Sequence, residues 1–189
     1  MRRRLTGRAP SSEAAPAADT PKPERRGIPA PTPIVGRRPS LTIGMPTYDD
    51  YDGVYFTLQA LRMYHGDALA DAEILVLDNH PTGPCAGALK ALEAASADYR
   101  YVPFFDGTGT LAAKQRVVEE ARGDFVLVMD CHVLLWPGAL ARLRRYLADN
   151  PGTSDLLQGP LVQDDLETLS SHLRPVWRDG MFGAWDLDP

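Results

Sequence analysis

The sequence predicts an α/β fold in which a mostly parallel sheet is flanked by helices. Four short apolar runs alternate with four segments of helical periodicity between residues 41 and 150. Strands and helices in this alternation are joined by right-handed crossovers, which makes neighbouring strands parallel and places helices on the faces of the sheet. The run at residues 125–129 is continuously apolar, as expected for a strand buried on both faces.

The first half of the fold is expected between residues 41 and 95. Its first strand should stop at Pro46 and its second at Asp78, because each apolar run ends there. The elements expected here are strand 41–45, a helix with Val54, Leu58 and Leu61 at helical spacing, strand 73–77 and helix 86–95.

The second half of the fold should follow directly. Gly123 is expected to end one helix, and Pro137 suits the first turn of another. The elements expected here are strand 99–105, helix 111–122, strand 125–129 and a last helix with Leu140, Leu143 and Leu147.

Charge and proline content divide the chain of 189 residues into a tail and a domain. Residues 1–39 hold eight of the seventeen prolines, with nine Lys/Arg against three Asp/Glu, so their net charge is +6. They show no hydrophobic period, which predicts a disordered tail, followed by one domain at 40–189. Because the whole chain carries −5, the domain carries −11. An acidic domain excludes general nucleic-acid binding, but it suits a cleft that takes up a cation with a diphosphate.

The sequence also indicates a cytoplasmic location. No apolar run approaches the roughly 18 residues of a membrane-spanning helix, which predicts no integral membrane segment. The basic start is not followed by the apolar stretch of a secretory signal. Cys85 and Cys131 do not make a disulfide framework, so both are expected as reduced thiols.

Polar residues follow each apolar run. The candidates, in chain order, are Pro46, Thr47, Tyr48, Asp49 and Asp50, then Asp78, Asn79 and His80, then Asp106 to Gly109, then Asp130, Cys131 and His132. Since the carboxyl ends of parallel strands meet at one edge of a sheet, these residues predict a polar cleft there. Turn chemistry alone explains any single one of these residues.

The strongest candidate in this cleft is a metal site at Asp130-Cys131-His132. In an extended segment residues i and i+2 point to the same side, so Asp130 and His132 can direct an oxygen and a nitrogen at one ion. That ligand pair suits Mn²⁺ or another borderline divalent ion better than Ca²⁺, and the expected cofactor is Mn²⁺ or Mg²⁺. Such an ion would hold two phosphate oxygens and neutralise a departing diphosphate. A structural histidine is the alternative for His132.

Three stretches resemble the family 2 glycosyltransferases, which have the Rossmann-like GT-A fold. They are LTIGMPTYDD at 41–50, AEILVLDNH at 72–80 and GTLAAKQRVVEEARGDFVLVMDCHVLLWPGAL at 109–140. The family motif D-x-D is D-x-H here, as in polypeptide N-acetylgalactosaminyltransferases. The resemblance implies that Pro46, Thr47 and Tyr48 line the nucleoside pocket and that Asp78 accepts from the base. It also implies that Lys114 contacts base or phosphates, and that Asp130 and His132 bind the metal.

The resemblance implies a metal-dependent glycosyltransferase that uses a nucleoside-diphosphate sugar, with a UDP-sugar favoured, and an unknown acceptor. The acceptor part is expected to be incomplete, as in a chain truncated at its C-terminus, and Asp164 and Asp165 are the only nearby candidates for a catalytic base. His172 is a weaker candidate for a further ligand, and Trp177 and Trp185 suit either a core or a sugar-facing wall. The alternatives are a nucleotide-sugar-binding module or fragment without turnover and, less fittingly, a response-regulator-like domain.

Overall fold

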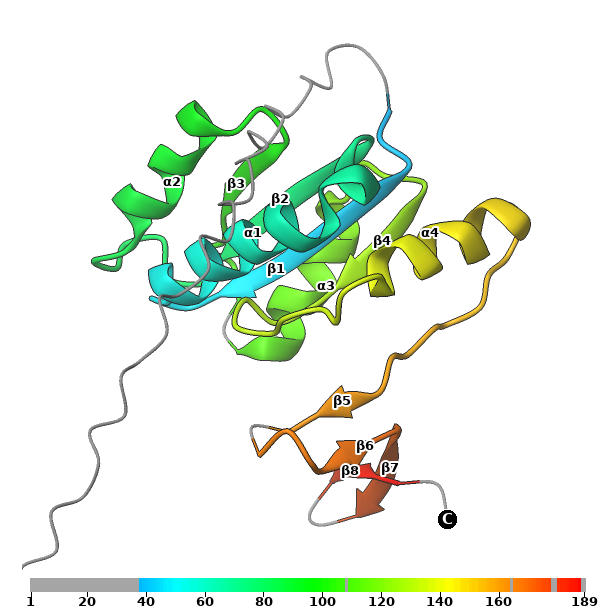
Figure 1. Ribbon diagram of the computed structural model, residues 1–189. Coiled ribbons are helices and arrows are strands. Elements are labelled where there is room, and N and C mark those ends of the chain that lie inside the picture. The colour runs from blue at the N-terminus through cyan, green and yellow to red at the C-terminus, as the bar shows by residue number, and fades with distance from the viewer. Residues whose placement is uncertain (1–37, 108, 164, 178–179, 188–189) are drawn as a thin grey trace, which may run out of the picture. The chain divides into compact units, whose positions relative to one another are not determined.

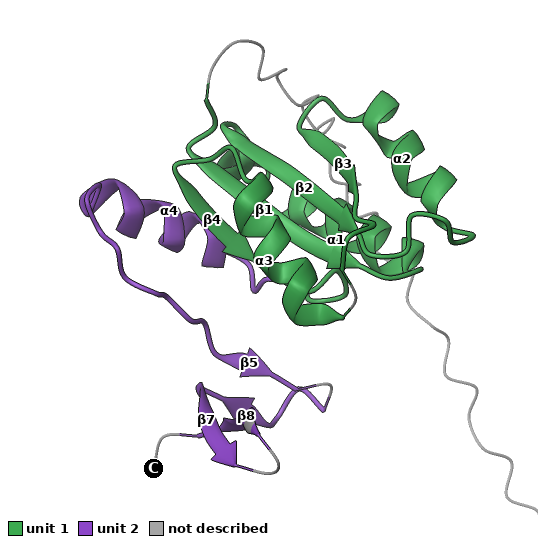
Figure 2. Ribbon diagram, turned by 180° about the vertical axis from the view of Figure 1, so that it is seen from behind, with its two compact units in different colours: residues 1–133 green, residues 134–189 purple. Residues whose placement is uncertain are grey.

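The structure is a computed structural model that describes residues 38–107, 109–163, 165–177 and 180–187. The predicted tail therefore lies outside the described residues, apart from Arg38 and Pro39. The chain forms two compact units, residues 1–133 and 134–189, which Figure 2 distinguishes by colour. Each is described by itself.

The first unit is built on a four-stranded parallel sheet, which confirms the predicted fold class. Its strand order is β3-β2-β1-β4. The strands are β1 (Leu41–Thr47), β2 (Ala72–Asp78), β3 (Tyr99–Pro103) and β4 (Phe125–Val128). Between them run α1 (Tyr51–His65), the short 3₁₀ helix η1 (Gly66–Leu69), α2 (Ala86–Ala95) and α3 (Thr110–Glu120). Helices α1 and α3 lie on opposite faces of the sheet (Figures 1 and 2).

Strand β1 continues through Pro46 to Thr47, two residues further than predicted. The carbonyl of Gly44 accepts from Met129 on the β4 side, and Pro46, two residues on, has the same orientation. Strand β4 has already ended at Val128. The N–H that proline lacks is therefore not needed there, which explains why a proline is tolerated in a central strand.

Helix α3 packs closely on the sheet. Buried side chains of β2 and α3 form a cluster made of Leu75, Leu77, Ala113 and Val117. A Cβ added to Gly44 would lie closer than 3.0 Å to Val117 Cγ1. The glycine therefore sets how near α3 can approach β1, and so positions the first turns of that helix.

Helix α1 begins at a conventional N-cap. The Asp50 carboxylate accepts from the backbone N–H of Gly53 at 2.8 Å. The predicted apolar stripe of Val54, Leu58 and Leu61 is buried. The cap fixes the chain where it leaves β1, and the stripe anchors the helix to the core.

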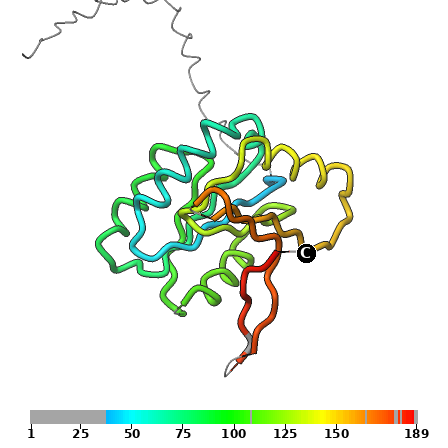
Figure 3. Tube along the Cα trace, turned by 60° about the horizontal axis from the view of Figure 1, so that its bottom comes forward, coloured from blue at the N-terminus to red at the C-terminus, as the bar shows by residue number. Residues whose placement is uncertain are grey.

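The second unit contains helix α4 (Ala139–Asp149), the two-residue strands β5 (Leu161–Val162) and β6 (Leu169–Ser170), and a hairpin of β7 (His172–Trp177) and β8 (Met181–Asp186). The hairpin can be followed as the red end of the trace in Figure 3. Leu140 of α4 is buried, whereas Trp177 and Trp185 are exposed. Among the described residues of both units, no helix has the length and apolarity needed to cross a membrane.

Candidate functional site

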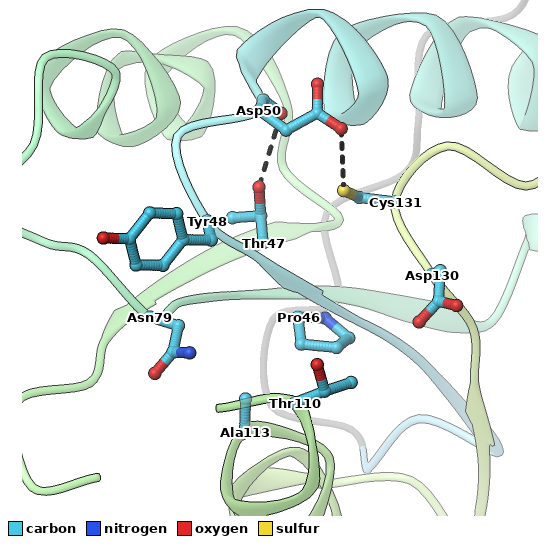
Figure 4. A pocket seen from close by; sticks show the side chains of 9 residues that line it. All are labelled: Pro46, Thr47, Tyr48, Asp50, Asn79, Thr110, Ala113, Asp130 and Cys131. Carbon is cyan, nitrogen blue, oxygen red and sulfur yellow. Dashed lines mark hydrogen bonds between the residues drawn. The ribbon is translucent and has the colours of Figure 1, made fainter. Parts of the chain in front are cut away.

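A cavity of about 150 Å³ lies at the carboxyl edge of the parallel sheet (Figure 4). Its lining comes from the end of β1, from the segments that follow β1, β2 and β4, and from the first turn of α3: Pro46, Thr47, Tyr48, Asp50, Asn79, Thr110, Ala113, Asp130 and Cys131. In the order β3-β2-β1-β4, the chain winds outward on one side of β1 and returns to place β4 on the other. That reversal is where open α/β sheets bind ligands.

The loop after β1 carries an aromatic platform at the cavity. The ring of Tyr48 is exposed and stacks on His80, with 4.8 Å between centroids and 9° between planes. His80 Nδ1 lies 2.5 Å from Asp49 Oδ2, which holds the imidazole. Asp49 has a positive φ of 49°, and Gly83 leaves room for its carboxylate, because a Cβ there would overlap Asp49 Oδ1. The platform is thus built from two separate loops.

Asp78 and Asn79 end β2 but have different surroundings. Asp78 is 1% exposed and does not line the cavity. It accepts from the backbone N–H of His80 at 2.9 Å and from the Tyr101 hydroxyl at 2.7 Å. Burial and the hydrogen bond to Asp78 raise the pKa of Tyr101 well above its usual value. Asn79 does line the cavity, and its buried Oδ1 has no hydrogen-bond partner among the described residues.

Asp130 lies in the cavity wall and forms an ion pair. Its Oδ1 is 2.9 Å from Lys114 Nζ, and both side chains are about two-fifths exposed, at 42% and 39%. The segment is not extended as predicted, because β4 ends at Val128 and the N–H of Val133 donates to the Asp130 carbonyl in a turn. Asp130 and His132 therefore do not meet as an i, i+2 pair on one side of a strand. Their joint role as metal ligands stays a prediction.

The structure brings His132 to Asp50 and Cys131 instead. Cys131 Sγ lies 3.4 Å from Asp50 Oδ2 and 3.9 Å from His132 Nδ1, which is 3.4 Å from the same Asp50 oxygen. The hydrogen bond from the Gly53 backbone is the main cause that lowers the pKa of Asp50. Burial, helped by Asp50, raises the pKa of Cys131 to about 11, so the thiol is protonated at neutral pH.

The two candidates for a catalytic base belong to the second unit. Asp165 is exposed and accepts three hydrogen bonds within its own turn, two from Thr168 and one from Glu167. The hydroxyl of Thr168 is the main cause that lowers the pKa of Asp165. A lowered pKa makes Asp165 a weaker proton acceptor, and its role as a base stays a prediction. Asp164 lies outside the described residues.

Sequence reasoning placed Asp50, Asn79 and Cys131 near the cleft without giving any of them a role. The sequence marked these three residues only by their position after a predicted strand, and other residues that do not line the cavity share that position. Thr110 and Ala113 had no signal, because they lie in the first turn of an ordinary amphipathic helix.

Comparison with known proteins gives a family and a fold. The model of glycosyl transferase family 2 matches residues 42–184. No curated protein matches the sequence. Among solved structures, TarS 1–349 of S. aureus gives a TM-score of 0.50 at 14% identity, covering 64% of this chain and 39% of that one. At this identity the likeness shows the fold alone.

Two further structures give lower scores. The mannosyltransferase PcManGT from Pyrobaculum calidifontis, in complex with GDP-Man and Mn²⁺, has a TM-score of 0.48 at 22% identity and covers 67% of this chain and 37% of that one. TarS 1–349 in complex with UDP-GlcNAc has a TM-score of 0.48 at 14% identity, with 64% and 37% covered. The chain thus spans less than two-fifths of the length of each of these proteins.

Proposed function

The chain belongs to glycosyl transferase family 2, and from that membership we propose that it is a metal-dependent glycosyltransferase whose donor is a nucleoside-diphosphate sugar, with UDP as the nucleotide. The observation that carries this proposal is the cavity at the sheet reversal. Its lining offers an aromatic face, an amide oxygen without a partner among the described residues, and a carboxylate that is paired with the Lys114 cation. The aromatic face and the amide oxygen suit a nucleobase, and the cation suits a diphosphate.

The nucleoside would lie at the end of the cavity formed by Tyr48. Pro46, Thr47 and Tyr48 line it, and the Tyr48 ring, backed by His80, presents an exposed face for stacking. Asn79 Oδ1 supplies an acceptor that has no partner among the described residues, as the N–H of a uracil requires. Asp78 lies behind this site rather than in the cavity lining, and we propose that it supports the base site by accepting from the His80 N–H and the Tyr101 hydroxyl.

The diphosphate would lie between the first turn of α3 and Asp130. Thr110 begins α3 and lines the cavity, and the free N–H groups of a helix N-terminus favour anions. The ion pair of Lys114 with Asp130 is half-exposed, so it is worth no more than about 1 kcal/mol and can be exchanged for other partners. Lys114 is then available to a phosphate and Asp130 to a cation.

A divalent ion, Mn²⁺ or Mg²⁺, held by Asp130 and His132 would neutralise charge on the departing diphosphate. The Asp130 carboxylate is the kind of oxygen ligand that such an ion prefers, and His132 would add one nitrogen ligand. The side chains point to different neighbours in the structure, Lys114 for Asp130 and Asp50 for His132. The proposal for this pair therefore rests on the residue types rather than on their placement.

The transfer itself would be attack of an acceptor hydroxyl on the anomeric carbon, with Asp164 or Asp165 retained as candidates for the base. Since the chain covers less than two-fifths of the solved structures that it matches, binding of the donor and its turnover are separate claims. A nucleotide-sugar-binding module without turnover is the second candidate.

The binding claim is tested by calorimetric titration of the chain with UDP, with and without Mn²⁺. We expect Mn²⁺ to strengthen UDP binding, and Asp130→Ala to remove that gain. Asn79→Ala should weaken UDP binding about five- to tenfold, as expected for one hydrogen bond. Asn150→Ala, outside the cavity, is the matched control. No UDP binding, or equal affinities for the Asn79 and Asn150 variants, would show that the nucleoside site is misplaced.

Turnover is tested separately by following hydrolysis or transfer of a UDP-sugar by the same chain. Release of UDP that depends on Asp130 supports the transferase. Tight UDP binding with no release of UDP above a protein-free control supports the binding module instead.

A further inference from the structure

We propose that Asp50, Cys131 and His132 form a zinc site with one open coordination position. The three ligand atoms are mutually close, within 4.8 Å of one another. Their separations are 3.4 Å from sulfur to oxygen, 3.9 Å from sulfur to nitrogen and 3.4 Å from nitrogen to oxygen.

These separations are those of a tetrahedral zinc ion. With bonds of about 2.3 Å to sulfur and about 2.0–2.2 Å to nitrogen and oxygen, tetrahedral angles place the ligand atoms about 3.4–3.6 Å apart. The largest difference is therefore a few tenths of an ångström, at the exposed ring of His132. The adjustment that the zinc site requires is therefore at the His132 imidazole, which is exposed to solvent.

The ligand types select the metal. A thiolate with an imidazole favours zinc over Mg²⁺, Ca²⁺ or Mn²⁺, which prefer oxygen ligands. The charges also balance, because a thiolate and a carboxylate together neutralise a dication. Three protein ligands with a free fourth position are the arrangement of catalytic rather than structural zinc.

Two of the ligands are held in place by other contacts. Asp50 uses Oδ1 to cap α1 at Gly53, which leaves Oδ2 for the site. The backbone of Cys131 is fixed by a buried hydrogen bond of 2.8 Å from the Thr57 hydroxyl to its carbonyl. Such outer contacts orient ligands before the metal arrives.

The site adjoins the cavity, since Asp50 and Cys131 both line it, and their contact is drawn in Figure 4. A water or a ligand oxygen could take the fourth position from that side. The zinc site takes His132 Nδ1, so zinc would compete for His132 with an ion at the proposed Asp130–His132 pair. It does not use Asp130, which pairs with Lys114. It stands on its own geometry and does not depend on the transfer reaction.

The test is titration of the full chain with Co²⁺, a spectroscopic substitute for zinc, followed by competition with Zn²⁺. We expect one Co²⁺ per chain, with a thiolate-to-cobalt charge-transfer band and the intense visible bands of tetrahedral cobalt. Cys131→Ser should abolish the charge-transfer band. Cys131→Ser and His132→Ala should each weaken Zn²⁺ binding more than tenfold, since loss of even an outer-shell partner costs about 10–100-fold.

Matched variants separate this site from its neighbours. Asp50→Asn removes the charge but keeps a side chain that caps helices well, so weaker metal binding there reports on the ligand. Cys85→Ser removes the other free thiol, which is not one of the three ligands, so this variant should keep the band. Asp130→Asn should also keep it.

The proposal is overturned if the wild-type chain shows no thiolate band, whatever its UDP affinity. It is also overturned if Asp130→Asn weakens Zn²⁺ binding as much as Cys131→Ser does, which would place the metal at Asp130 and His132. Circular dichroism checks that each variant is folded, and Cys131→Ala serves as a second variant if Cys131→Ser is not.

Discussion

Gly44→Ala should destabilise the first unit, although glycine is normally the weaker residue in a strand. The new methyl would lie closer than 3.0 Å to Val117 Cγ1, whereas carbon atoms in contact lie about 3.5–4.0 Å apart. Helix α3 must therefore move outward by at least about 0.5 Å, or Val117 must leave its rotamer. Overpacking of this kind costs about 1–3 kcal/mol, which lowers Tm by about 2–4 °C per kcal/mol in a chain of this size.

Urea unfolding at pH 7 measures the free energy of unfolding for this variant. The matched control is Gly87→Ala on α2, where nothing lies within 4 Å of an added Cβ, so it should stabilise by up to about 1 kcal/mol. Val117→Ala removes the obstructing methyls, and the double variant should be more stable than the sum of the two single effects by about 0.5 kcal/mol or more. Additive costs, or a stabilising Gly44→Ala, would refute the account of how α3 is positioned.

Two further substitutions probe the edge of the cavity. Asp50→Ala should cost about 0.5–2 kcal/mol through loss of the α1 cap. Folding lowers the pKa of Asp50 from its usual 3.8, so its negative charge stabilises the fold above that pH and the stabilisation is lost in acid. The free energies of unfolding of the variant and the wild type, measured in urea, should therefore differ less at pH 3 than at pH 7. An equal difference at both pH values would contradict this. Lys114→Gln should change the free energy of unfolding by less than about 1 kcal/mol, but it should weaken UDP binding in calorimetry. Lys90→Gln on α2 should leave UDP binding unchanged. Equal UDP affinities of the two variants would exclude Lys114 from the site.

The fold was predictable because its strands are apolar runs of the length that a buried parallel sheet requires. The end of β1 was not predictable, because a proline interrupts a strand only where a neighbouring strand would accept a hydrogen bond from the N–H that proline lacks. Whether Pro46 has such a neighbour depends on the length of β4, 80 residues later, and local sequence does not show it. Strand β3 ends at Pro103, two residues before the predicted end at residue 105.

The site was predictable as a location but not as a set of contacts. The sequence places Asp130 and His132 after a strand, and the prediction assumed that the strand continued between them. The chain turns there, which directs His132 toward Asp50, 82 positions away. A contact between residues so far apart in the sequence follows from the packing of α1 beside the end of β4. Likewise, the choice between Asp78 and Asn79 depends on which way each side chain points at the end of β2, and only the structure shows that.

The four-residue length of β4 has a consequence for design. Since β1 is seven residues long, its last residues extend beyond their neighbour, and the cavity opens beside them. The cavity is therefore shaped by a difference in strand length as well as by the side chains around it. Extending β4 by two residues would carry its pairing with β1 from Gly44 to Pro46, which lines the cavity, while every lining residue kept its identity. A redesign that preserved all nine side chains could still remove the site, and one that preserved the strand lengths could change its ligand.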